Sequence, residues 1–273
     1  MHRPSTRLCG ALIVAALGAR AGEAAAQDFG VGPQREPTLT TSRLGLETSW
    51  ASFNLPNNQG DYNRGEYFGL TVRGDVKLAR NVGLRLLVPM YLLQLDGQTA
   101  SNSFGDAALR VRVLLLDANP WRFYAGLEQQ LPTGNTAIGT GQGGVQFSPF
   151  ITGGWRKGSV VVYASVADSI GLHPRWGTGR LEPVDYVDPS YDHELRSNLG
   201  AIGEIAEPLY VNVALTDVTV LEPGNAGKTL LIGGAALGYV VSEDFKLVLV
   251  GQLPIAGEHR FEQRIGLNAY LYF

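Results

Sequence analysis

The last nine residues of the chain, Ile265-Gly-Leu-Asn-Ala-Tyr-Leu-Tyr-Phe273, alternate between two kinds of position. Every second residue from Ile265 to Phe273 is apolar, whereas the residues between them are glycine, asparagine or tyrosine. A period of two indicates a β-strand whose two faces meet different surroundings. The apolar row continues to the terminal residue, although chain ends that are not held in a sheet are usually frayed. This stretch therefore predicts a strand that is paired up to its last residue.

The same alternation recurs in about twelve segments. In residues 82–90, for example, the even positions from Val82 to Met90 are apolar and Arg85 lies on the other face. The segments at 160–162 and 230–232 have no clean parity, so the pattern does not assign their facing. An even number of strands is typical of single-chain bacterial barrels. The expected strands are 43–50, 67–78, 82–90, 106–115, 121–130, 145–155, 159–167, 195–205, 209–216, 229–241, 245–253 and 261–273.

The connections between these segments alternate between short and long. The short ones are 80–81, 117–120, 156–158, 206–208 and 242–244, and the long ones are 54–63, 95–103, 132–144, 171–192, 222–228 and 254–260. Outer-membrane barrels have short periplasmic turns and longer extracellular loops. The chain is therefore expected to be all-β: a transmembrane, antiparallel, up-and-down β-barrel over 41–273, with about 12 strands and periplasmic termini.

Aromatic residues agree with the outward parity. Near the predicted periplasmic rim this parity holds Trp121, Trp155, Phe245 and Phe273, and near the opposite rim it holds Trp50, Phe68 and Phe147. Aromatic rings favour the headgroup level of a bilayer, so membrane barrels carry two aromatic girdles. A closing strand that ends on Phe273 is also similar to the tail that the outer-membrane assembly machinery recognises.

The first residues have the pattern of an export signal. Arg3 and Arg7 precede a short apolar core at 10–18, and the small residues 24–26 offer a cleavage site before Gln27. That core is shorter than the roughly 20 residues that a transmembrane helix needs. We expect a signal peptide at 1–26, which would remove Cys9, and a periplasmic lead at 27–40 before the barrel.

Charge and composition exclude few classes. The formal net charge is −3, and −5 without the expected signal peptide, whereas a nucleic-acid surface needs a basic excess. The apolar fraction of 45% is average for a soluble protein, because a membrane barrel shows lipid only alternate residues. Periodicity, and not composition, therefore decides the class.

No residue pattern indicates catalysis, a metal or a cofactor. His173, His193 and His259 lie in long loops, and Asp185, Asp188 and Asp192 near His193 lack tight ligand spacing. Solvated loop residues explain them better than a metal site does. The segment 139–144 matches G-x-G-x-x-G, but it leads into a strand and so lacks the helix end that holds a pyrophosphate. A lipase would need a serine paired with a histidine on an outward strand face, and no expected strand holds a histidine.

The inward parity carries many charges. We expect the following residues to line the lumen: Arg43, Arg73, Arg85, Arg110, Arg112, Arg122, Glu128, Arg196, Lys246 and Arg264. Inward acids such as Glu47, Asp75 and Asp106 accompany them. Such residues can form a lattice of ion pairs that satisfies a polar interior, or a mildly cationic lumen that selects solutes. The lattice is favoured for any single arginine, and both can hold together.

Two segments resemble a known family. Phe104-Gly-Asp-Ala-Ala-Leu-Arg-Val-Arg-Val113, then Leu131-Pro-Thr-Gly134 and Ile138-Gly-Thr-Gly141, are similar to the outer-membrane family named for the meta-pathway of phenol degradation. The motif residues are Gly105, Asp106, Leu131, Pro132, Thr133, Gly134, Gly139, Thr140 and Gly141. Ile138 replaces the usual leucine, and the long loop 171–192 has no counterpart in this resemblance. The resemblance implies a transporter barrel for aromatic or other hydrophobic compounds, and Leu131 and Pro132 are interpreted as a strand exit.

The leading hypothesis is a passive channel or transporter for small organic solutes in the bacterial outer membrane, without catalysis or cofactor. Its expected partners are membrane lipid, lipopolysaccharide, a small solute and the assembly machinery, but no nucleic acid. The second hypothesis is a closed structural or surface-interaction barrel that acts through loop 171–192. A lipid-modifying outer-membrane enzyme is third.

Overall fold

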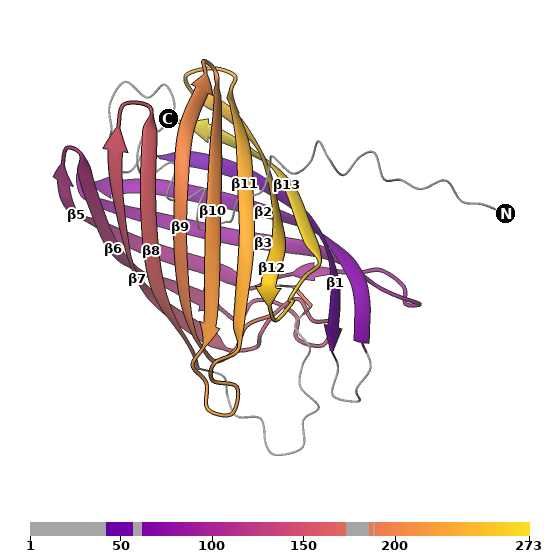
Figure 1. Cartoon of the computed structure of the whole chain (residues 1–273). Coiled ribbons are helices and arrows are strands. Elements are labelled where there is room, and N and C mark those ends of the chain that lie inside the picture. Colours follow the sequence, from indigo (N-terminus) through magenta and orange to yellow (C-terminus); the bar gives the residue numbers. More distant parts are fainter. Residues whose placement is uncertain (1–41, 57–61, 173–185, 188) are drawn as a thin grey trace.

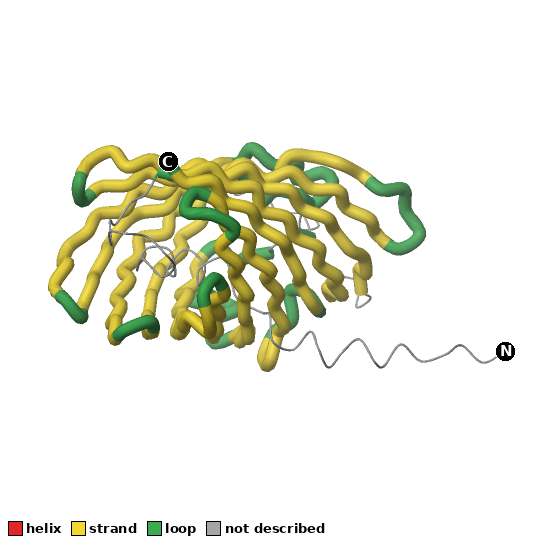
Figure 2. The backbone as a smooth tube through the Cα atoms, turned by 90° about the horizontal axis from the view of Figure 1, so that it is seen from above, coloured by secondary structure: helices red, strands yellow, loops and turns green. Residues whose placement is uncertain are grey.

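The computed structural model describes residues 42–56, 62–172, 186–187 and 189–273. The expected signal peptide, the expected lead and most of loop 171–192, with His173, Asp185 and Asp188, lie outside these ranges. All regular elements of the described part are strands (Figure 2). Among these residues there is no helix long and apolar enough to cross a bilayer. The strands are β1 Arg43–Pro56, β2 Tyr62–Ala79, β3 Val82–Leu95, β4 Ser101–Phe104, β5 Ala107–Ala118, β6 Trp121–Leu131, β7 Val145–Lys157, β8 Val160–Leu172, β9 His193–Ala206, β10 Leu209–Val220, β11 Thr229–Val240, β12 Phe245–Gly257 and β13 Gln263–Tyr272.

The strands form one closed antiparallel barrel. Except for β4 and β5, which do not pair with each other, each strand pairs with its neighbour in sequence, and β1 also pairs with β13, with Leu46 opposite Ala269. Pairing between β2 and β3 completes the ring (Figure 1). The short β4 and the longer β5 both pair with β3, so they occupy one position in the wall. The barrel thus has twelve strand positions, which confirms the predicted fold class and strand number.

At the long-loop end of the barrel, several strands are longer than the sequence predicted. Residues 101–103 were expected in a loop, but residues 101–104 form β4 opposite Met90 to Leu93 of β3. The predicted start of the next strand at Asp106 is therefore wrong, because Gly105 and Asp106 interrupt a strand that already runs at Ser101. β1 and β3 likewise extend to Pro56 and Leu95. In β1 and β3 the apolar parity reverses at these ends, because Phe53, Leu55 and Leu93 face the interior, and the outward pattern of the wall therefore did not extend to them.

The two ends of the barrel differ as predicted. The connections 80–81, 119–120, 158–159, 207–208 and 241–244 are short and lie at one end, together with the carboxyl-terminal residue (Figure 1). The longer connections, including 132–144 and 221–228, lie at the other end. By the convention of outer-membrane barrels, the short-turn end is periplasmic and the long-loop end is extracellular.

The outer surface is apolar. Side chains of one parity on every long strand are exposed, for example Leu46, Val72, Leu199, Val213 and Leu267. The aromatic residues Phe68, Trp121 and Phe273 are also exposed, with 47%, 49% and 77% of their surface accessible. So much exposed apolar surface is unstable in water, because burial gains about 25 cal/mol for each Å². This surface is therefore one that contacts lipid.

A charge on this surface should destabilise the barrel. Leu199 lies in the middle of β9 and is 56% exposed. We expect Leu199→Arg to lower the free energy of unfolding in phospholipid vesicles by about 2–4 kcal/mol, the cost of arginine near the bilayer midplane. Urea titration followed by gel mobility would measure it. Leu221→Arg, in a long-loop turn and 40% exposed, is the matched control; an equal loss there would contradict a lipid-facing band.

Two apolar clusters lie at the two ends of the interior. The periplasmic cluster contains Tyr124, Val161, Tyr163, Ile202, Tyr210, Ala236, Val240, Val248, Tyr270 and Tyr272. The extracellular cluster contains Ala51, Phe53, Leu55, Tyr67, Tyr91, Leu93 and Val187. Glycines make room for the rings: a Cβ on Gly238 would lie 2.0 Å from the Tyr210 ring. Polar residues lie between the two clusters and also within the periplasmic one, where Arg43 and Lys246 contact the Tyr272 ring.

Candidate functional site: the barrel interior

A cavity of about 310 Å³ lies inside the barrel. Its walls come from most strands of the ring, although not from β1, and seven arginines but only two carboxylates line it. Of the residues predicted to face the lumen, the cavity is lined by Arg73, Arg85, Arg110, Arg112, Glu128, Arg196 and Arg264. The other three do not line the cavity. Arg43 donates a hydrogen bond to Asp75, and Arg122 pairs with Asp117 at a periplasmic turn. Lys246 lies over the Tyr272 ring.

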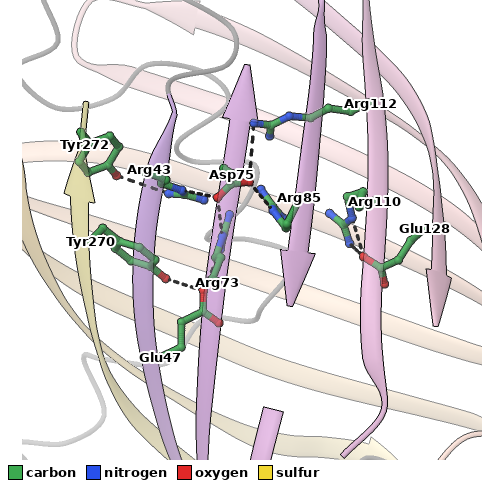
Figure 3. A network of polar contacts seen from close by, with 10 residues as sticks. All are labelled: Arg43, Glu47, Arg73, Asp75, Arg85, Arg110, Arg112, Glu128, Tyr270 and Tyr272. Carbon is green, nitrogen blue, oxygen red and sulfur yellow. Dashed lines mark hydrogen bonds and ion pairs between the residues drawn. The ribbon is translucent and has the colours of Figure 1, made fainter. Parts of the chain in front are cut away.

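Asp75 is the centre of a polar network in the described part of the wall (Figure 3). Its carboxylate is 1% exposed and accepts hydrogen bonds from Nε of Arg43 at 2.6 Å, Arg73 at 2.7 Å and Arg85 at 2.7 Å. Arg112 Nη2 lies 4.0 Å from the same carboxylate. One acid on β2 thus organises arginines from β1, β2, β3 and β5.

The strand registers explain why these residues meet. Arg43 is opposite Asp75 in the β1–β2 pairing, and Asp75 is opposite Arg85 in the β2–β3 pairing. Directly opposed residues of adjacent antiparallel strands have Cβ atoms about 4.5–5.5 Å apart, so their side chains interact. Arg43 is also held by aromatic rings, because its guanidinium lies 4.7 Å from the centroid of Tyr270. The network is therefore built from cross-strand neighbours.

Two smaller ionic groups complete the cavity wall. Arg110 pairs with Glu128 across β5 and β6, with 2.6 Å between Nη2 and Oε2. Towards the extracellular end, Glu194 is fully buried and contacts two arginines, Arg196 at 2.9 Å and Arg260 at 2.6 Å. The sequence reasoning missed Glu194 and Arg260. Glu194 shares the inward parity of Arg196, which could have identified it, but Arg260 lies in a loop where no periodicity operates.

Asp106 holds the loop 132–144 over the cavity. Its Oδ1 accepts a hydrogen bond from the Gly134 amide at 2.8 Å, and its Oδ2 accepts one from the Gln142 amide at 2.8 Å. The Gln130 side chain also donates to Oδ2, at 3.2 Å. Since one carboxylate holds both arms of the loop, we call Asp106, Gly134 and Gln142 the loop clamp.

The motif residues of the family resemblance converge on this clamp. Thr133 Oγ1 donates to the Gly105 carbonyl at 2.9 Å, and Thr140 Oγ1 donates to the Phe104 carbonyl at 3.0 Å. A Cβ on Gly134 would lie 2.6 Å from the Cα of Gly141, so the two arms touch at glycines. β6 ends at Leu131, which confirms the predicted strand exit before Pro132. In this chain these residues shape a loop.

Part of the long extracellular loop 171–192 packs onto the same region. The Tyr186 amide donates to the Gly139 carbonyl at 3.0 Å, and the Tyr186 ring stacks on Phe53 at 5.5 Å. Val187 and Pro189 line the cavity. Further along, Lys228 Nζ donates to Tyr191 Oη at 2.8 Å, and this contact raises the pKa of Lys228 above its ordinary value. Loop residues thus form the extracellular side of the cavity.

The remaining candidate sites have other partners. His193 was expected in a loop, but it is the first residue of β9, and its Nε2 lies 2.8 Å from Asp168 Oδ1 on the neighbouring strand. In the described ranges no three histidine, cysteine or acidic side chains are grouped as metal ligands would be. The segment 139–144 leads into β7 at Val145, as expected, and not into a helix.

Comparisons with known proteins identify the fold. No family model and no curated relative matches the chain. It is similar to an outer-membrane channel from Pseudomonas putida F1, with a TM-score of 0.64 and 12% identity over 86% of this chain and 96% of that one. It is also similar to the KdgM porin crystallised with oligogalacturonate, with a TM-score of 0.54 and 8% identity over 85% and 99%. A third similar structure is the β domain of the Bordetella autotransporter BrkA, with a TM-score of 0.52 and 11% identity over 85% of this chain and 100% of that one.

The sequence identities are low, but each similarity covers most of both chains, so the comparisons show the fold and not the function. They do not show that the chain belongs to the phenol-degradation family, so that resemblance stays a prediction. Together with the closed wall and its apolar outer band, they give the conclusion that the chain is a twelve-stranded β-barrel of the outer-membrane type, located in the bacterial outer membrane.

Proposed function

We propose that the chain is a passive channel for small organic solutes, without catalysis or cofactor. The observation that carries this proposal is the polar cavity inside a lipid-facing wall, with seven arginines among its lining residues. Similarity to a channel and a porin supports it. The family resemblance would extend the solutes to aromatic or other hydrophobic compounds. Residues 1–26 would direct export, and the assembly machinery would insert the barrel beside lipopolysaccharide.

Reconstitution tests this proposal. The purified chain in planar bilayers should give discrete ionic conductance steps, and liposomes containing it should take up small organic solutes. We expect small steps, because apolar side chains occupy part of the interior at both ends. A folded barrel that passes neither ions nor aromatic acids would overturn the proposal. Heat-modifiable gel mobility verifies that the barrel is folded in each preparation.

A closed barrel that acts through loop 171–192 is the second candidate. The two apolar clusters favour it, since they narrow the interior where a wide pore would be open. Deleting 173–185 discriminates between the two functions: a channel should keep or increase its conductance, whereas a surface-interaction barrel should lose its partner and stay folded. A lipid-modifying enzyme would need a nucleophile beside a histidine, but His193 contacts Asp168.

A further inference from the structure

The positive charge of the cavity wall exceeds its counter-charge. The network of Figure 3 contains five arginines and three carboxylates, namely Glu47, Asp75 and Glu128. Arg110 and Glu128 neutralise each other, so the group around Asp75 has four arginines for two acids. An excess of charge of one sign is costly in a protein interior, where electrostatic interactions are stronger than in water. An anion in the cavity would reduce this cost.

Two of these arginines have unused hydrogen-bond donors. Nη2 of Arg73 and Nη2 of Arg85 are buried, and neither donates a hydrogen bond to any residue in the described part of the chain. Buried donors normally have partners, and an exception calls for an explanation such as a missing ion or ligand. Both side chains line the cavity and both are only 3% exposed. The unused donors and the excess positive charge therefore both lie in the cavity wall around Arg73 and Arg85.

An apolar strip begins beside this positive group. Along the inward face of β3, Arg85 is followed by Leu87, Pro89 and Tyr91, and all four line the cavity. Phe150 lines it as well, and the Arg110 guanidinium lies 5.0 Å from its ring centroid. The strip runs towards the extracellular end, because β3 runs that way from its periplasmic turn. A solute that enters from outside would meet apolar surface and then arginine.

We propose that the cavity is a binding site for a small organic carboxylate. Its carboxylate would accept hydrogen bonds from Arg73 and Arg85, and its apolar part would lie along Leu87, Pro89 and Tyr91. Arginine suits this role, because its planar fork of donors matches a carboxylate. The volume of about 310 Å³ is at the lower end of the range of about 300–1,000 Å³ for small-molecule sites. This inference rests on the proposed channel, whose transported solute it specifies.

Calorimetric titration of the folded, full-length chain in detergent tests the site directly. Sodium benzoate has both required parts, sodium acetate lacks the apolar part, and benzyl alcohol lacks the charge. We expect benzoate to bind at least about tenfold more tightly than either, because benzyl alcohol cannot make the charged hydrogen bonds and acetate has no apolar group to lie along the strip. Benzyl alcohol or sodium phosphate binding as tightly as benzoate would overturn the inference.

Matched variants locate the site. Arg85→Gln and Arg73→Gln should each weaken benzoate binding by roughly ten- to a hundredfold. Arg122→Gln is the control, because Arg122 is a buried arginine of the same wall that pairs with Asp117 outside the cavity. Equal losses in Arg85→Gln and Arg122→Gln would contradict the assignment. If an arginine variant does not fold, Leu87→Asn replaces it and should weaken benzoate binding but not acetate binding.

Conductance separates this inference from the proposed function. Millimolar benzoate should block chloride current through the wild-type chain, and Arg85→Gln should relieve that block. A channel that conducts but neither binds benzoate nor is blocked by it would overturn the carboxylate site and leave the channel intact. Benzoate binding to a chain that does not conduct would overturn the channel and leave the site intact.

Discussion

Asp75→Ala is expected to destabilise the folded barrel by about 3–5 kcal/mol, as removal of one partner from a buried ion pair does. The reason is that three arginines donate to this carboxylate at 2.6–2.7 Å, and their charges would stay buried without it. Stabilities of folded domains are about 5–15 kcal/mol. A loss of this size would therefore leave little folded protein in moderate urea. Urea titration in phospholipid vesicles, followed by gel mobility, measures the change.

Two further variants identify the cause. Asp168→Ala removes an acid that is 43% exposed and pairs with His193, so it should change stability by less than about 1 kcal/mol. Asp75→Ala combined with Arg85→Met should recover part of the loss, because neighbours in one network are coupled by about 0.5–3 kcal/mol. If the double variant is no more stable than Asp75→Ala, the lost charge compensation is not the cause.

The sequence predicted the wall of the barrel well because the wall is periodic. Each strand meets lipid on one side and the interior on the other, so its residues alternate, and the closing strand 265–273 shows this most clearly. Short periplasmic turns then fixed the order of the strands. The prediction erred where the wall leaves the membrane, at residues 101–104, because no lipid face imposes alternation there.

For the interior, the sequence predicted which side chains face inward but not which of them contact one another. Parity placed Arg73, Arg85 and Asp75 on the inward face, but their meeting depends on the register between strands. Parity also could not separate the cavity from the apolar layers, since tyrosines such as Tyr163 and Tyr270 share the inward face with the arginines. The loop residues Arg260 and Gln142 belong to the cavity wall through tertiary folding alone.

Asp106→Ala is expected to open the extracellular side of the cavity. The substitution leaves the Gly134 and Gln142 amides without their acceptor, and each buried donor without a partner costs about 1–3 kcal/mol. The loop 132–144 should then leave its position for a substantial fraction of the time. Limited proteolysis in intact vesicles should cut this loop at least tenfold faster than in the wild-type chain, and single-channel conductance should increase.

Controls show whether the clamp itself is responsible. Asp106→Asn retains Oδ1 for the Gly134 amide but replaces the other acceptor with a donor, so its effect should lie between wild type and Asp106→Ala. Asp96→Ala changes an exposed acid in another extracellular turn and should leave both proteolysis and conductance unchanged. The barrel wall should stay folded in all three variants, because its strand pairing does not involve these side chains. Faster cleavage of loop 132–144 without any rise in conductance would show that the loop covers the cavity without limiting flow through it.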